Sequence, residues 1–169
     1  MMKALTAKFF VDYFSGTWKG KVFLNGVHKS EIILRYAENN ELNASLALGA
    51  VIGVVHGEQI QEDNMLSGQG GWRSDMHRWC ELWYDKSGAY NELQWTSLQE
   101  LNGVKVLYGF VHECKEEGND PAEYIAMCEL TDTANFKFTG QSYRRGLVEI
   151  VASRTKNTED SGTGTAPDP

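Results

Sequence analysis

From residue 17 onward the sequence alternates apolar and polar residues in short runs that are separated by turn residues. The run 30–36, for example, places three large apolar residues on one face of an extended strand. Asn25-Gly26 and Asn102-Gly103 are strong hairpin signals, because both residues of such a pair tolerate a positive φ. About ten short strands with this spacing predict an all-β domain, either a sandwich or a barrel.

The two ends of the chain do not follow this alternation. Large apolar residues from Leu5 to Phe14 recur at helical spacing, which predicts one short helix within 2–14 that covers the mouth of a barrel or packs outside its wall. The segment 157–169 consists of small, polar and acidic residues and is typical of a disordered tail. The 169 residues therefore predict a single domain over 1–156.

Two motifs favour the barrel over the sandwich. Gly16-x-Trp18 begins the first predicted strand, and Arg154 ends the last one. This pair resembles the signature of the calycins, which are the lipocalins, the fatty-acid-binding proteins and their bacterial relatives. The resemblance implies a closed antiparallel lipocalin-like β-barrel of about 8–10 strands, in which Trp18 plugs one end and Arg154 packs across its indole.

A barrel of this size has an interior with room for side chains and one modest ligand. We therefore expect a binding protein for a small hydrophobic or amphipathic molecule, in the manner of a lipid-binding barrel. The clearest candidate row for the cavity alternates with Lys105 and Glu113, which prefer water, and consists of Val106, Tyr108, Phe110 and His112.

Two neighbouring strands supply further candidates. Leu93 and Trp95 form a second row. In the run 79–85 we favour the orientation that points Trp79, Glu81 and Trp83 inward, and Glu81 then needs a partner such as Arg73, Arg78 or Arg144. In the opposite orientation Trp79 and Trp83 lie on the outer wall and indicate a dimer interface.

Arginines raise the possibility of an anionic ligand. Arg73 follows Gly68–Gly71, a stretch that predicts a bulge or sharp turn, and it either holds an anionic head group or pairs with Asp75 or Glu81. Arg144, beside Tyr143, is the second candidate, because the fatty-acid-binding barrels that the chain resembles hold carboxylates with late-strand Arg and Tyr.

An enzyme on the same barrel is the alternative function. Ser/His/Asp nucleophile contexts, Walker loops and dinucleotide motifs are missing from the sequence. An isomerase or lyase would use Glu81, Arg73, His77 or Tyr108. The opening Lys8-Phe9-Phe10 before the Gly-x-Trp also resembles that of lipocalin-fold bilin lyases, which implies chromophore handling.

Composition and motifs argue against several partners and cofactors. The net charge of −7 and the pI near 5.1 disfavour a nucleic-acid binder. His112 and Cys114 lack metal-ligand spacing, and no His follows His112 to ligate haem, so we expect no cofactor. Cys80, Cys114 and Cys128 are expected to be plain buried thiols. Because we find no secretory signal and no membrane-spanning run, a cytoplasmic location is expected.

Overall fold

The structure is a computed structural model that describes residues 2–38, 45–55, 65–84, 90–114, 122–142 and 146–155. Within these ranges the chain forms one helix and eleven strands. The elements in order are β1 (Met2–Lys3), α1 (Ala7–Phe14), β2 (Gly16–Leu24), β3 (Val27–Glu38), β4 (Ser45–Val55), β5 (Met65–Arg73), β6 (Arg78–Tyr84), β7 (Tyr90–Leu101), β8 (Val104–Cys114), β9 (Ala122–Leu130), β10 (Asn135–Ser142) and β11 (Gly146–Arg154).

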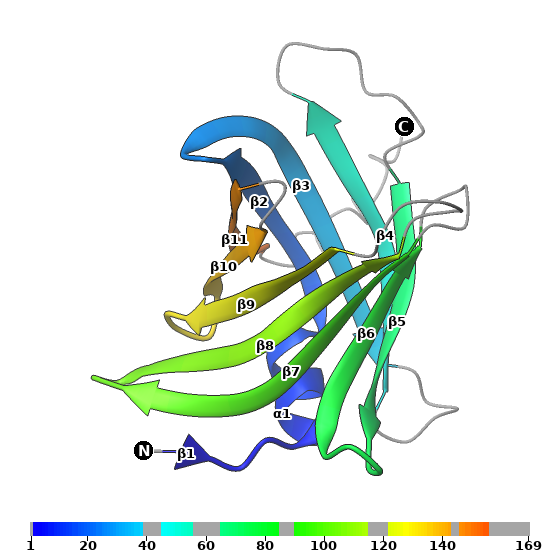
Figure 1. Cartoon of the computed structure of the whole chain (residues 1–169), viewed down its shortest axis with the longest axis vertical. Helices are drawn as coiled ribbons and strands as arrows, with labels where there is room; N and C mark the ends of the chain where they lie inside the picture. Colours follow the sequence, from blue (N-terminus) through cyan, green and yellow to red (C-terminus); the bar gives the residue numbers. More distant parts are fainter. Residues whose placement is uncertain are drawn as a thin grey trace, which may run out of the picture.

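The strands form one antiparallel sheet that curls strongly on itself, as Figure 1 shows. Its order is β1-β7-β6-β5-β4-β3-β2-β11-β10-β9-β8, and β7 additionally pairs with β8. The first long strand, β2, therefore lies beside the last strand, β11. The predicted all-β antiparallel fold with one short N-terminal helix is confirmed.

Both predicted hairpin turns are present. Asn25 and Gly26 connect β2 to β3 with φ angles of 49° and 80°, and Asn102 and Gly103 connect β7 to β8 with φ angles of 51° and 80°. Positive φ at both central positions matches the right-handed twist of the flanking strands, which is why these dipeptides define the register of their hairpins.

The glycine-rich stretch of β5 is not the predicted sharp turn, and the irregularity nearest to it is a register shift of the β4–β5 pairing between Leu48 and Val51, beside Gly68. Residues from Ser67 to Arg73 pair with β6 one by one without a register shift. A Cβ atom on Gly70 would lie only 3.0 Å from the ring of Trp79, and one on Gly68 would lie 2.1 Å from the carbonyl oxygen of Leu82. Glycine is required here because neighbouring groups approach the backbone closely, not because the chain turns.

Helix α1 covers one end of the curled sheet (Figure 1). Thr6 caps its N-terminus by accepting a hydrogen bond from the N–H of Phe9 at 3.2 Å. Its apolar face buries Phe10, Val11 and Phe14, and the Phe10 ring stacks on that of Trp79 with centroids 4.7 Å apart. Of the two predicted positions, the helix takes the one at the mouth of the curled sheet.

Trp18 and Arg154 meet where β2 pairs with β11, as the sequence predicts. Trp18 is 0% exposed, and the Arg154 guanidinium lies 4.4 Å from the centroid of its indole. The indole N–H donates to the carbonyl oxygen of Phe14 at 2.9 Å. The indole also contacts Phe136, whose ring centroid lies 4.9 Å away with its plane tilted by 60°. A tilted aromatic contact, a cation–π contact and a buried hydrogen bond thus fix this one side chain.

Arg154 also binds the backbone that leads out of the helix. Its terminal nitrogens donate to the carbonyl oxygens of Tyr13 and Ser15. Gly16 has a φ of 120°, and a Cβ atom there would lie 2.9 Å from a guanidinium nitrogen. The glycine of the Gly-x-Trp motif therefore serves both the unusual backbone conformation and the access of Arg154.

We predict that Arg154→Lys lowers the free energy of unfolding by about 2 kcal/mol, because an ammonium group cannot bind two carbonyls and stack on the indole at once. Arg35→Lys, on an exposed part of β3, is the matched control and should change stability by less than about 0.5 kcal/mol. Urea denaturation measures both. Equal stability of the two variants would contradict the role given to Arg154.

Candidate functional site

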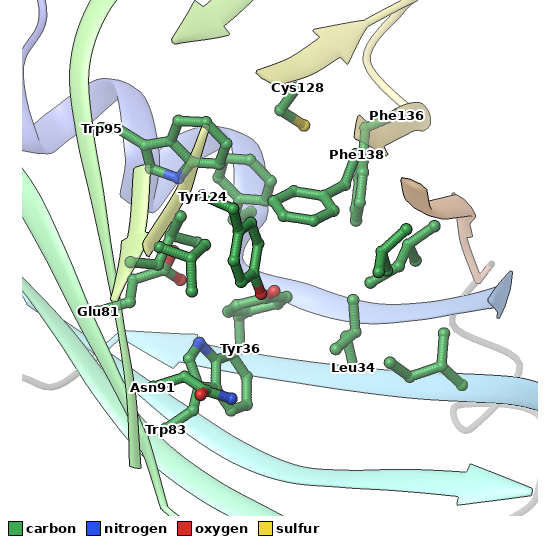
Figure 2. A pocket seen from close by; sticks show the side chains of 16 residues that line it. Leu34, Tyr36, Glu81, Trp83, Asn91, Trp95, Tyr124, Cys128, Phe136 and Phe138 are labelled. Carbon is green, nitrogen blue, oxygen red and sulfur yellow. The ribbon is translucent and has the colours of Figure 1, made fainter. Parts of the chain in front are cut away.

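The concave side of the curled sheet holds a cavity of about 200 Å³ that is partly open to solvent. Side chains from α1 and from β3, β6, β7, β8, β9, β10 and β11 line it, and Figure 2 shows them converging on its centre. The lining residues are Phe14, Ile32, Leu34, Tyr36, Glu81, Trp83, Asn91, Leu93, Trp95, Val111, Tyr124, Cys128, Phe136, Phe138, Val148 and Ile150. An enclosed space of about 150 Å³ already admits benzene, so this cavity suits a molecule of roughly ten non-hydrogen atoms.

The polar groups of the cavity are concentrated on one side. Glu81, Trp83 and Asn91 come from the β6–β7 pair, whereas Leu34 and Phe138 belong to the opposite, apolar side (Figure 2). The hydroxyl-bearing rings of Tyr36 and Tyr124 reach in between. This separation of polar and apolar surface can orient a ligand that has one polar end.

Glu81 is the chemically distinctive residue of the cavity. Its side chain is buried, with only 6% of the residue exposed. Burial raises the pKa of its carboxyl group from the ordinary 4.5 to about 8, and a hydrogen bond from Trp95 opposes part of that rise. An apolar environment disfavours the charged form, so the group is mostly protonated at neutral pH.

Three further titratable groups share this interior. Burial, and secondly the nearby Glu81, raise the pKa of the Tyr36 hydroxyl well above its ordinary value. The pKa of the Cys128 thiol is raised for the same two reasons. A buried thiol of this kind is a poor nucleophile, because the reactive thiolate is suppressed. Tyr124 has room because Gly140, opposite its ring, carries no Cβ atom.

The structure places four of the residues predicted to line a cavity at its surface. Leu93, Trp95, Glu81 and Trp83 line the cavity, as expected for the favoured orientation of β6. Trp79 also points inward, but it lies under the helix, stacked on Phe10, and not on the cavity surface. Because the β6 tryptophans point inward, the alternative in which they form an outer dimer surface is wrong.

The predicted face of β8 is wrong. Val111 lines the cavity and Leu107 is fully buried, so the odd-numbered residues face inward. Val106, Tyr108, Phe110 and His112 lie on the other face and do not line the cavity. Lys105 and Glu113 misled the prediction. Lys105 extends over the Phe9 ring at the helix end, 5.7 Å from its centroid, and Glu113 is buried at the other end of the strand.

The residues of the misassigned β8 face have their own contacts. His112 lies 3.0 Å from the carboxylate of exposed Glu123, and Arg78 lies 6.0 Å from the centroid of the Phe110 ring. The carbonyl oxygen of Tyr108 accepts a hydrogen bond from Thr96. On this face Val106 is buried, whereas Tyr108, Phe110 and His112 are half-buried.

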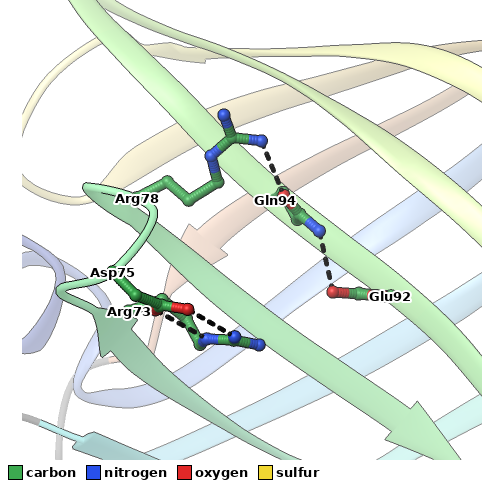
Figure 3. A network of polar contacts seen from close by, with 5 residues as sticks. All are labelled: Arg73, Asp75, Arg78, Glu92 and Gln94. Carbon is green, nitrogen blue, oxygen red and sulfur yellow. Dashed lines mark hydrogen bonds and ion pairs between the residues drawn. The ribbon is translucent and has the colours of Figure 1, made fainter.

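Two of the three arginines expected near Glu81, Arg73 and Arg78, bind other residues (Figure 3). Arg73 is exposed and pairs with Asp75 at 2.9 Å, which confirms the structural alternative for this residue and not the anion site. Arg78 donates to Gln94 at 2.9 Å, and Gln94 in turn donates to Glu92. Among the described residues, the Trp95 indole is the hydrogen-bond partner of the Glu81 carboxyl.

Several predictions fall outside the described residues, namely Arg144 with its neighbour Tyr143, and the tail 157–169. Within the described ranges, no group of three or more His, Cys, Asp or Glu side chains could hold a metal ion. Sequence analysis missed Asn91, Tyr124 and Phe138 as lining residues, although each alternates with outward residues along its strand. The three apolar residues that share one face of the run 30–36 also line the cavity but were not proposed as site residues; they are Ile32, Leu34 and Tyr36.

Comparison with known proteins leaves the site to be interpreted from its own geometry. No protein-family model matches the chain, and no curated protein is significantly similar to it in sequence. In the described part of the chain, no helix is both long enough and apolar enough to cross a membrane.

The buried carboxyl group makes stability depend on pH. The folded state retains the Glu81 proton up to about pH 8, while the unfolded chain loses it near 4.5. Stability contributed by this group is therefore complete below 4.5 and is lost as the pH rises toward 8. We predict that Glu81→Gln, relative to wild type, is more stabilising at pH 9 than at pH 4.5, by a few kcal/mol.

Urea denaturation at the two pH values measures this difference. Glu92→Gln, a half-buried outer-face change on β7, serves as the control for loss of one carboxylate. A Glu81→Gln effect that is the same at both pH values would contradict the burial of an uncompensated carboxyl group.

Proposed function

We propose that the chain is a calycin-like binding protein whose sheet closes into a barrel and holds one small hydrophobic or amphipathic molecule. The observation that carries this proposal is the internal cavity, which is lined from eight different elements and has its polar groups on one side. A fully packed interior would have no such space, and close packing is the norm in protein cores.

Closure into a barrel is supported by the strand pairing. β2 pairs with β11 through Trp18 and Arg154, and β7 pairs with β8 along its whole length. Each strand from β2 to β11 thereby has a partner on both sides. The arrangement of Gly16, Trp18 and Arg154 adds to the calycin interpretation, because an indole plug under a late arginine is what the resemblance implies.

The size and chemistry of the cavity narrow the ligand. Pockets for drug-sized ligands measure roughly 300–1,000 Å³, so a cavity of about 200 Å³ suits a smaller, compact molecule better than a long-chain lipid. Among the described lining residues there is no Lys, Arg or His. An anionic head group therefore has no support from the lining, and we do not propose one.

Binding of a neutral molecule of this size tests the proposed function. We expect 2-phenylethanol to bind wild-type protein with one-to-one stoichiometry and to change the fluorescence of the cavity tryptophans Trp83 and Trp95. Val111→Phe fills the cavity and should weaken binding at least tenfold, because it removes the space that the ligand needs.

The matched control is Ile125→Phe, a similar enlargement at a residue of β9 that is 74% exposed. It should bind as wild type does. Equal affinity of all three proteins, or no binding by wild type, would contradict the cavity as the ligand site. Native mass spectrometry of freshly purified protein would additionally reveal a molecule carried over from the cell.

A second function, proton transfer by an isomerase-type enzyme, is favoured by one observation. Glu81 is a buried acid whose pKa of about 8 lies near neutral pH, where a general acid or base works best. Of the four residues considered for catalysis, only Glu81 lies in the cavity. Arg73 and His77 are exposed, and Tyr108 lies on the outer face of β8.

A small ketone tests this second function. If Glu81 moves protons, wild-type protein in D₂O should exchange the α-protons of phenylacetone faster than buffer does. The carboxylate takes one proton from the α-carbon, the resulting carboxyl group exchanges that proton with D₂O, and it then delivers a deuteron to the α-carbon. Glu81→Gln should reduce the rate to that of buffer. Loss of the α-proton signal in ¹H NMR measures the exchange, and a wild-type rate equal to that of buffer would contradict catalysis of this kind.

A further inference from the structure

Among the residues that the structure describes, Glu81 has no positively charged partner of the kind that a buried carboxyl group usually has. The described arginines nearest to it in the chain are engaged elsewhere, Arg73 with Asp75 and Arg78 with Gln94. No basic side chain lies among the described lining residues. The carboxyl group thus lies at the cavity wall beside Trp95 and other rings, without an ion pair in the described part of the chain.

A glutamine at this position would accept the same hydrogen bond from Trp95 at lower cost, since it has no charge to desolvate. What a carboxyl group adds is the ability to become negative. The Trp95 N–H already favours that form, because it donates to the carboxyl oxygen. The site therefore contains a carboxyl group that can become negative and an indole N–H that stabilises the negative form. A cation bound beside it would complete an ion pair.

The surroundings of Glu81 suit an ammonium group. The rings of Tyr36, Trp83 and Tyr124 line the same cavity, and the Tyr36 and Trp83 rings meet edge to face at 6.1 Å. Aromatic faces attract cations, most strongly when water is excluded. A primary ammonium has three N–H donors. The oxygen acceptors among the described lining residues are the Glu81 carboxyl group, the Asn91 amide and the tyrosine hydroxyls.

We propose that the cavity ligand is a small primary amine of roughly ten non-hydrogen atoms, whose ammonium group pairs with the Glu81 carboxylate and whose hydrocarbon body lies against Leu34 and Phe138. This inference rests on the proposed ligand-binding function. The protons balance: an amine that arrives charged displaces the Glu81 proton to solvent, and one that arrives neutral accepts that proton.

Other titratable groups face this site and have to be separated from it. They are Tyr36 on β3, Tyr124 and Cys128 on β9, and Glu113 on β8. Glu113 pairs in register with Asn91 of β7 but does not line the cavity. Burial raises the pKa values of Tyr36 and Cys128, which keeps both neutral near pH 7.5. Gly70, the β5 residue beside Glu81, contributes no titratable side chain.

Three probes of nearly equal shape test the proposal by calorimetry at pH 7.5: 2-phenylethylamine, 2-phenylethanol and phenylacetate. We expect wild-type protein to bind the amine at least tenfold tighter than the alcohol, and to bind phenylacetate weakest. In Glu81→Gln the preference for the amine over the alcohol should fall below twofold, while the alcohol affinity stays within about twofold of wild type. Retained alcohol binding proves that this variant is folded.

Two control variants remove a negative charge elsewhere. Glu31→Gln lies on the exposed face of β3, and Glu113→Gln lies on the inner face of β8 outside the cavity lining. Both should keep the amine preference. If long-range attraction by the net charge of −7 produced the preference, Glu31→Gln would reduce it as much as Glu81→Gln does, and the proposal would be overturned.

The remaining outcomes distinguish failure of the amine preference from failure of ligand binding itself. If the alcohol binds as tightly as the amine, or phenylacetate binds tightest, the amine inference is overturned while the ligand-binding function stands. The same holds if Glu81→Gln retains the preference. If none of the three probes binds, the ligand-binding function fails for molecules of this size, and the amine inference fails with it.

Discussion

The packing of Arg154 on Trp18 holds together the end of the sheet that forms the base of the cavity. The guanidinium lies 4.4 Å from the indole centroid and binds the backbone that follows the helix. The indole in turn contacts Phe136 and hydrogen-bonds to the carbonyl of Phe14. Because Phe14 and Phe136 both line the cavity, a single cluster joins the first strand, the last strand, the helix and the base of the ligand site.

Beyond this cluster, the Glu81 carboxyl group is buried in an apolar interior, where ionisable groups are usually avoided. A carboxyl group without an ion-pair partner among the described residues costs stability. Glu81 bears that cost beside Gly70, where an added Cβ atom would lie only 3.1 Å from the Glu81 side chain. Groups of this kind are typical of functional sites, where stability is given up for chemistry. Ligand capture and proton transfer both draw on the same property, which is a charge that can be switched on inside an apolar cavity.

The sequence predicted the framework because its signals are local. Asn25-Gly26 and Asn102-Gly103 determine turns through their own backbone preferences, and the Gly-x-Trp motif with a distant arginine identifies which strands meet. The orientation of β6 could be predicted because its two faces differ in aromatic content. These features do not depend on knowing what lies across the sheet.

The rest of the site could not be predicted because it depends on the neighbours of each strand. On β8 both faces are apolar in the middle, and the polar residues at its ends, Lys105 and Glu113, are explained by the helix end and by burial. Similarly, Gly68–Gly71 resembles a turn in sequence, but it is part of a strand that pairs regularly with β6 and that Trp79 approaches closely. Arg73 was separated from the cavity only by its position on the outer surface.

The central claim is that Glu81 is a buried, uncompensated acid at the wall of a ligand cavity, and a ¹³C NMR titration of its side-chain carboxyl signal tests this most directly. We predict a midpoint near pH 8 in the free protein and a lower midpoint once 2-phenylethylamine is added. A midpoint near the ordinary 4.5 in the free protein would mean that the carboxyl group is solvated or paired, and would contradict the account of the site.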